Sequence, residues 1–242
     1  MEKFQQKIHH KENKVEKHNI KKGVDLVFEN SPELEKIGSN EKYSEYVGTI
    51  FPKSKIRDIL YHGTNSQAYK NILKEGFDLN KSGSNLGYMG KIASFATIKD
   101  ITNNFTEGPI VPVIVNITSE YINDSVELNN EGIKKIKEGL IDSGAVGPFI
   151  QNIKSFNDDI NSASVNNNMR MKNATEMTKI KNYLTMYSEK GIDVCNEILI
   201  SLGISGLRRN EHVIDMLDTK QIHILGSDQD IESFKKFMNS HS

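Results

Sequence analysis

The stretch Ile56-Arg57-Asp58-Ile59-Leu60-Tyr61-His62-Gly63-Thr64 decides the fold that we expect for this chain. It is an apolar, strand-like run whose side chains would point to opposite faces in turn, which predicts a strand that ends at His62. The following segment, 66–75, has apolar residues at helical spacing and predicts a helix that Gly76 ends. A glycine after a strand lets a ligand approach the main chain closely, and open sheets bind ligands at strand ends. His-Gly-Thr alone is more often a simple turn, so the other motifs of the chain decide between these alternatives.

Composition limits the classes of protein to consider. The chain has 242 residues, 36% of them hydrophobic and 26% charged, which suits one globular domain with or without a helical subdomain. The formal net charge of −1 provides no general attraction to nucleic acid or to acidic membranes. No apolar run approaches the roughly 20 residues that span a bilayer. Cys195 is the single cysteine, which excludes an internal disulfide framework and fits a reducing compartment.

The first 22 residues differ in composition from the rest. They carry seven lysines against three glutamates and have few large apolar side chains. This pattern predicts a solvated helix or a disordered arm, with a basic contact for a partner as the alternative. The arm has no apolar segment typical of a signal peptide, so we expect a cytoplasmic protein. Delivery into a host or target cell stays open.

Residues 23–242 are expected to form one α+β domain. Apolar residues at helical spacing predict a helical insertion over about 131–202. Gly203 and Gly206 are expected to flank a turn. Alternating or apolar runs predict further strands, and a last helix follows residue 228; the strands are 91–97, 112–118, 212–216 and 221–225.

Three motifs then fall in order along the chain. They are Tyr61-His62-Gly63-Thr64, Gly90-Lys91-Ile92-Ala93-Ser94-Phe95-Ala96-Thr97, and Asn210-Glu211-His212-Val213-Ile214-Asp215 followed by Gln221-Ile222-His223-Ile224-Leu225. Together they resemble the ADP-ribosyltransferases of the His-Tyr-Glu group, the branch that includes diphtheria toxin and the poly-ADP-ribose polymerases. The resemblance covers roughly residues 54–106 and 204–238. It implies a mixed, mostly antiparallel split β-sheet with an NAD cleft between its halves.

The resemblance also implies roles for single residues, with NAD as the co-substrate. Glu211 and His62 are the catalytic candidates. Cleavage of the bond between nicotinamide and ribose builds positive charge on the ribose, and a fixed carboxylate, here Glu211, stabilises that charge. The resemblance places His62 on the adenosine ribose, the Gly63 main chain on the nicotinamide amide, and Thr64 beside it. No metal is needed.

At Ser94 the chain departs from the family pattern, which has a tyrosine whose ring stacks on nicotinamide. Such stacking is worth about 1–3 kcal/mol, so its loss is expected to weaken NAD binding. Tyr88, in the preceding loop, is a candidate for a replacement ring, and Phe95 matches the family phenylalanine. Because side chains alternate along a strand, we expect Ser94 and Ala96 to face the ligand and Phe95 to face the core. Ser94→Tyr is then expected to be tolerated or to tighten NAD binding.

The sequence leaves alternatives for the molecule that accepts ADP-ribose and for the reaction itself. Arginine-modifying relatives carry Glu-x-Glu, whereas this chain has Arg209-Asn210-Glu211, which disfavours arginine as the acceptor. We expect transfer of one ADP-ribose to a macromolecule, with a protein as the first expectation and a nucleic acid not excluded. An NAD glycohydrolase would use the same residues. A catalytically inactive module that binds a nucleotide or a partner is the alternative from another class.

Overall fold

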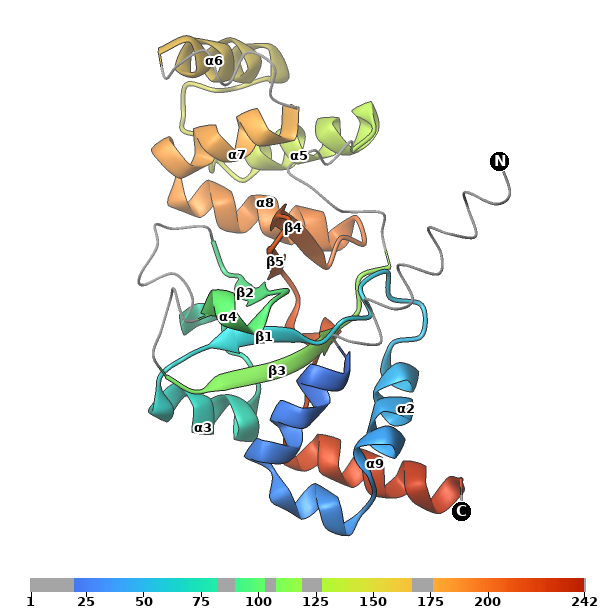
Figure 1. The fold of residues 1–242 in the computed structure, drawn as a ribbon. Helices are drawn as coiled ribbons and strands as arrows, with labels where there is room; N and C mark the ends of the chain where they lie inside the picture. Colours follow the sequence, from blue (N-terminus) through green and yellow to red (C-terminus); the bar gives the residue numbers. More distant parts are fainter. Residues whose placement is uncertain (1–19, 82–89, 103–107, 119–127, 167–175, 242) are drawn as a thin grey trace, which may run out of the picture. The chain divides into compact units, whose positions relative to one another are not determined.

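The computed structural model describes residues 20–81, 90–102, 108–118, 128–166 and 176–241, and within them the chain is an α+β protein (Figure 1). Its strands are β1 (Leu60–Gly63), β2 (Ala93–Ala96), β3 (Ile110–Val115), β4 (Gly206–Asn210), β5 (Val213–Met216) and β6 (Ile222–Ile224). They form one antiparallel sheet in the order β4-β5-β2-β1-β3-β6.

The chain divides into two compact units. Unit 1 comprises Met1–Phe77, Phe95–Thr118 and Lys220–Ser242, and unit 2 comprises Asp78–Ser94 and Ser119–Thr219. Strand β2 is shared, because its first two residues count with unit 2 and its last two with unit 1. The β4–β5 hairpin lies in unit 2, together with the helices over about 131–202. The sequence predicted these helices as an insertion within a single domain.

Unit 1 places helices against strands β1, β3 and β6. A helix over 20–30 is followed by η1 (Pro32–Lys36), α2 (Asn40–Ile50), α3 (Ser66–Glu75), α4 (Lys99–Thr102) and α9 (Asp228–Ser240). Figure 1 shows α2 and α9 side by side, and their rings meet where Tyr43 lies edge-on to Phe234 at a centroid distance of 5.0 Å. Tyr61 of β1 and Ile114 of β3 pack into the same apolar core.

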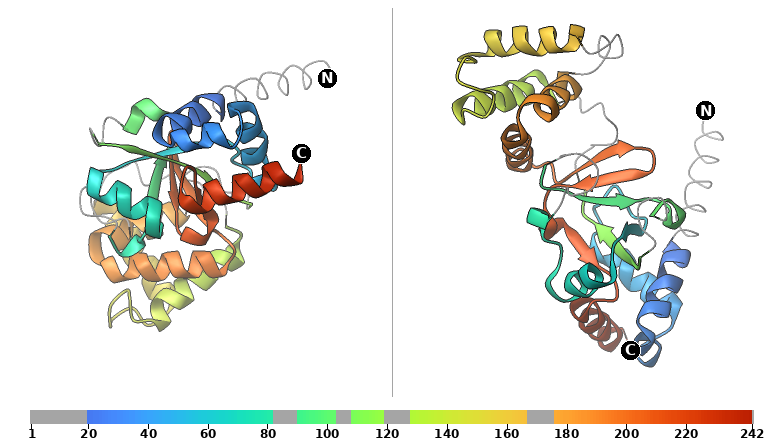
Figure 2. Two further views of the ribbon diagram at one scale, coloured as in Figure 1. Left: turned by 90° about the horizontal axis from the view of Figure 1, so that it is seen from below. Right: turned by 90° about the vertical axis from the view of Figure 1, so that its left-hand side faces the viewer.

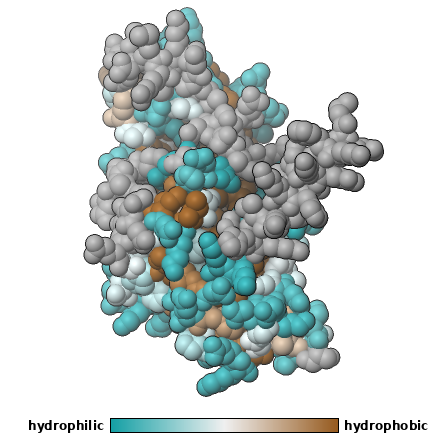
Figure 3. Space-filling model, in the orientation of Figure 1, coloured by the Kyte–Doolittle hydropathy of each residue, from teal (hydrophilic) through white to brown (hydrophobic). Residues whose placement is uncertain are grey.

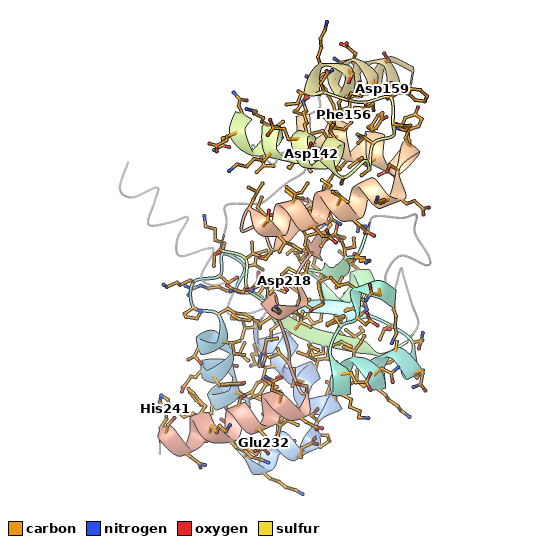
Figure 4. All side chains as sticks on the ribbon, turned by 180° about the vertical axis from the view of Figure 1, so that it is seen from behind. Asp142, Phe156, Asp159, Asp218, Glu232 and His241 are labelled. Atoms are coloured by element: carbon orange, nitrogen blue, oxygen red, sulfur yellow. The ribbon has the colours of Figure 1, made fainter. Side chains whose placement is uncertain are left out.

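Unit 2 has a second core, built mainly by helices. They are η2 (Leu79–Lys81), α5 (Asn130–Asp142), α6 (Ile153–Asn166), α7 (Glu176–Tyr187) and α8 (Glu189–Ser201), and Figure 2 shows the last four lying against one another. Phe156 and Asp159 of α6, labelled in Figure 4, both contact Tyr183 of α7, the first by ring packing and the second by accepting a hydrogen bond at 2.5 Å. Lys137 of α5 is buried and donates to Glu176 of α7 at 2.5 Å.

Local signals predicted both ends of α3 correctly, whereas the asparagine-rich stretch from 157, which was expected to be a loop, continues α6 to Asn166. Asn65 caps α3 by accepting from the amides of Gln67 and Ala68, and Gly76 ends it with a φ of 84°. The helix predicted over 66–75 is confirmed, and the helical pattern is confirmed in the described residues of 131–202 by α5 to α8.

The strand expected over 56–62 was wrong in extent, and β4 was not predicted. The strand expected from Ile56 begins at Leu60. The segment before it is held by the Ser54 hydroxyl, which contacts the Ile56 and Val115 carbonyls, and by one main-chain hydrogen bond from Lys55 to Ile117. The turn expected between Gly203 and Gly206 ends where β4 begins, at Gly206. The glycines obscured this strand because glycine disfavours strand interiors.

No helix in the described ranges is long and apolar enough to cross a membrane. On the face drawn in Figure 3, polar residues in teal surround the apolar residues in brown. Each described unit has its own buried apolar cluster, so the apolar side chains of the helices are largely used within the fold.

A buried carboxylate links the helices of unit 1 to the last strand. Asp230 of α9 is 0% exposed and accepts from the hydroxyls of Tyr43 and Tyr46, from the Gly226 amide at 2.8 Å, and contacts His223 Nε2 at 2.7 Å. Burial, followed by the charge of Asp230, raises the pKa of the Tyr43 and Tyr46 hydroxyls. Both tyrosines therefore stay protonated and act as donors.

We predict that Asp230→Asn lowers the free energy of unfolding by about 1–3 kcal/mol, because an amide NH₂ replaces an acceptor that is surrounded by donors. Urea unfolding of the purified protein measures the loss. Asp228→Asn, an exposed substitution in the same helical turn, is the control and is expected to cost about 0.3–1 kcal/mol through the helix dipole. Equal unfolding midpoints for the two variants would contradict the role of Asp230.

Candidate functional site

The strand register fixes the directions of the main-chain groups at the end of β1. The Thr64 amide donates to the Pro109 carbonyl at 3.0 Å, so the main-chain groups of Thr64 face β3. These groups alternate sides along an antiparallel strand, so those of His62 also face β3. The N–H and C=O of Tyr61 and Gly63 therefore point to the opposite side of β1, where β2 lies.

The ladder on that side is short. β1 and β2 share the pair Tyr61↔Ala96 within the described residues, whereas β1 and β3 are paired from Leu60↔Val113 to Gly63↔Ile110. The half-buried Gly63 thus ends β1 with one donor and one acceptor directed away from β3. Because glycine has no Cβ, a planar group can approach both atoms closely.

The His62 ring is held by two phenylalanines of unit 1. Phe77, just after α3, lies edge-on to it at a centroid distance of 5.1 Å, and Phe95 of β2 lies tilted to it at 5.7 Å. The two phenylalanine rings also meet each other at 5.2 Å. Phe95 is 1% exposed and His62 is half-buried, so the cluster fixes the imidazole while leaving part of it accessible.

The structure gives the burial of the β2 side chains and their register against β1. Phe95 is buried, as expected, but the pair Tyr61↔Ala96 sets Phe95 opposite His62, and opposed residues share a face. Ser94 and Ala96 lie on the other face of β2 from Phe95, and Ala96 is buried opposite Tyr61. That Ser94 and Ala96 face the ligand stays a prediction. Tyr88, the candidate for a replacement ring, lies outside the described residues.

Ser94 instead belongs to a polar cluster of unit 2. Its hydroxyl donates to Asp215 Oδ1 at 2.7 Å and accepts from Arg209 Nη2 at 3.1 Å. The Arg209 guanidinium also binds both carboxylate oxygens of Asp215, through Nε at 2.9 Å and Nη2 at 2.7 Å. The Asp215 side chain is 6% exposed and that of Arg209 31%. A charge as buried as Asp215 requires such partners, so the cluster is a fixed part of the fold.

Glu211 lies in the two-residue turn between β4 and β5. Its side chain is 82% exposed and its Oε1 is 2.9 Å from His212 Nε2. Its carbonyl oxygen accepts from Arg208 Nη1 at 3.0 Å. The main chain of the turn is thus tied back to β4, while the carboxylate extends into solvent.

The predicted site residues divide between the two units. His62, Gly63, Thr64 and Phe95 belong to unit 1, whereas Ser94 and Glu211 belong to unit 2. Sequence reasoning did not assign roles to three further residues: Phe77, Arg209 and Asp215. The signals for the last two were an arginine in an arginine-poor chain and an acidic residue inside an apolar strand.

Other chemistries have less support in the described part of the chain. It contains no group of three or more His, Cys, Asp or Glu side chains arranged to hold a metal ion. Burial raises the pKa of the Cys195 thiol to about 11, which disfavours a thiolate nucleophile. Burial, with a smaller effect from Asp58, raises the pKa of Tyr61 to about 12, so its hydroxyl stays protonated.

Comparison with known proteins adds no relative: no protein-family model matches the chain, and no significant match was found among curated proteins or solved structures.

We predict that Ser94→Tyr lowers the thermal stability, contrary to the expectation from the family pattern. The substitution removes a donor from the buried Asp215, which costs about 1–3 kcal/mol. Thermal unfolding measures the change, and Ser94→Thr is the control because it retains the hydroxyl. A Ser94→Tyr protein with wild-type stability and tighter NAD binding would restore the original expectation.

Proposed function

We propose that this protein transfers ADP-ribose from NAD to a macromolecular acceptor and releases nicotinamide. In this reaction the bond between C1′ of the ribose and the nicotinamide nitrogen breaks, and its electron pair leaves with nicotinamide. A nucleophile on the acceptor forms the new bond to C1′ and gives up its proton. The three ordered motifs suggest this chemistry, and the main-chain geometry of Gly63 is the observation that carries it.

The carboxamide of nicotinamide has an acceptor oxygen beside a donor NH₂. Gly63 presents the complementary pair, since its N–H and C=O both point away from β3 at the end of β1. Two parallel hydrogen bonds to a planar amide give orientation as well as affinity. This match favours nicotinamide over a ligand that carries a carboxylate, because the Gly63 carbonyl would repel a second acceptor.

His62 is suited to a neutral contact with a ribose hydroxyl. A neutral imidazole donates from one nitrogen and accepts at the other. Its ring is held edge-on by Phe77, so its nitrogens keep a defined direction. The Thr64 amide, next to Gly63, donates to the Pro109 carbonyl, and the proposal assigns Thr64 to a position beside the carboxamide.

Glu211 supplies the charge that the reaction requires. As the C–N bond breaks, positive charge develops on the ribose, and a carboxylate nearby lowers the energy of that state. Its exposed side chain contacts His212 rather than a buried cation, so it retains the freedom to turn towards a substrate.

Two alternative functions remain, an NAD glycohydrolase and a catalytically inactive binding module. In an NAD glycohydrolase, water takes the place of the acceptor and the same residues act. An inactive binding module is favoured by Ser94, whose hydroxyl is engaged by Asp215 where relatives carry the stacking ring. Nicotinamide release separates both enzymes from the module. Transfer of labelled ADP-ribose to macromolecules of a cell lysate separates the transferase from the glycohydrolase.

We predict that Glu211→Gln reduces nicotinamide release by on the order of 10²- to 10³-fold while the fold is retained. The substitution keeps the size of the side chain and removes its charge. Glu197→Gln, at an exposed position of α8 in the same unit, is the matched control and is expected to retain activity. Near wild-type release by Glu211→Gln would exclude the proposed role of this carboxylate.

We predict that His62→Ala raises KM for NAD by about tenfold, equivalent to one hydrogen bond of about 1.4 kcal/mol, with a smaller fall in kcat. The reason is that His62 is assigned to the ribose distant from the bond that breaks. His62→Phe retains the packing against Phe77 and separates lost hydrogen bonding from lost packing. If both variants turn over NAD with the wild-type KM, the Tyr61–Thr64 stretch is only a turn.

A further inference from the structure

The hairpin that carries Glu211 contains a β-bulge. Arg208 pairs with Ile214 and Asn210 pairs with Val213, so Arg209 is the extra residue on β4. A bulge increases the local twist of a hairpin and redirects the residues around it. The direction of the turn at 211–212 therefore depends on how this extra residue is held.

The Arg209 guanidinium restrains the bulge through its contacts with Asp215 and Ser94. It binds Asp215 across the hairpin through two hydrogen bonds, and Asp215 lies directly opposite Leu207 in the ladder. The Ser94 hydroxyl closes the cluster by contacting both charged groups. This planar two-point contact defines the position of the arginine more strictly than a point charge would.

Arg208 restrains the turn itself. Its Nη1 donates to the Glu211 carbonyl at 3.0 Å, three residues further along the chain. The main chain at Glu211 is thus held by the residue before the bulge, and the bulge is held by Asp215 and Ser94. The Glu211 side chain itself remains 82% exposed.

We infer, on the basis of the proposed function, that Arg209, Asp215 and Ser94 form a positioning network that fixes the orientation of the hairpin turn carrying Glu211. These residues act through the hairpin and do not contact the substrate. The Ser94 hydroxyl then has a function in this protein, because a tyrosine at position 94 would remove one of the three residues of the network. A displacement of about 1 Å at a catalytic group can cost on the order of 10²-fold in rate, so such a network controls kcat.

The test removes the ion pair without leaving a buried charge. The double variant Arg209→Met and Asp215→Leu replaces both members by apolar residues, which often preserves stability. We expect kcat for nicotinamide release to fall on the order of 10²-fold, with KM for NAD changed less than about threefold. Arg209→Lys keeps the charge but not the two-point contact and is expected to have an intermediate kcat.

The matched control is another ion pair of the same unit that has one buried member, Lys137. Lys137→Met with Glu176→Leu removes the contact between α5 and α7 and is expected to leave kcat unchanged at a similar melting temperature. Hydrogen exchange of the amides at 211–213 provides a readout that does not depend on activity. We expect faster exchange there in the Arg209/Asp215 variant and wild-type exchange in the control.

The outcomes separate this inference from the proposed function. A folded Arg209/Asp215 double variant that has the wild-type kcat and the wild-type hydrogen exchange at 211–213 overturns the network. This holds even if the wild-type protein cleaves NAD and Glu211→Gln does not. If the double variant does not fold, Arg209→Lys decides: a wild-type kcat for it overturns the inference. Absence of nicotinamide release by the wild-type protein overturns the proposed function, whereas faster exchange in the variant would still support the restraint on the turn.

Discussion

The register of β1 against β3 is the constraint on which the candidate site depends. One hydrogen bond, from the Thr64 amide to the Pro109 carbonyl, establishes the side to which every main-chain group of β1 points. A slip by one residue would direct the Gly63 donor and acceptor into the β3 ladder and would also exchange the faces of Tyr61 and His62. Pro112 of β3 is compatible with this register: it has no N–H to donate, and its carbonyl accepts from Leu225 on the β6 side at 3.0 Å.

The two units hold their candidate residues by different means. In unit 1, aromatic packing fixes the His62 ring, and a glycine main chain provides the hydrogen bonds. In unit 2, a nearly buried carboxylate, Asp215, holds an arginine at a bulge. Removing one partner of such a pair leaves a buried charge and is costly, so neither Arg209 nor Asp215 can be lost alone without destabilising the hairpin. Glu211 is exposed by comparison, which fits a side chain that acts on a substrate.

Local signals in the sequence predicted most helices and the end of β1, because caps and helix-ending glycines act within a few residues. Asn65 and Gly76 show this for α3. The contacts around the candidate site were not predictable in the same way, since they join residues distant in the chain. Ser94 meets Asp215 only after β2 and β5 are placed in one sheet, and Arg209 lies at a bulge that no periodicity reveals. The face of Phe95 depended likewise on a pairing register.

The most direct test of the central claim is to titrate ¹⁵N-labelled protein with nicotinamide and to follow the main-chain amide of Gly63. If the end of β1 binds the carboxamide, the Gly63 signal shifts in a saturable way as its N–H donates to the nicotinamide oxygen. Nicotinic acid, which has a carboxylate in place of the amide, produces a much weaker shift, because the Gly63 carbonyl then faces an acceptor. A Gly63 signal that stays unchanged at saturating nicotinamide, or that shifts equally with both compounds, would contradict the account.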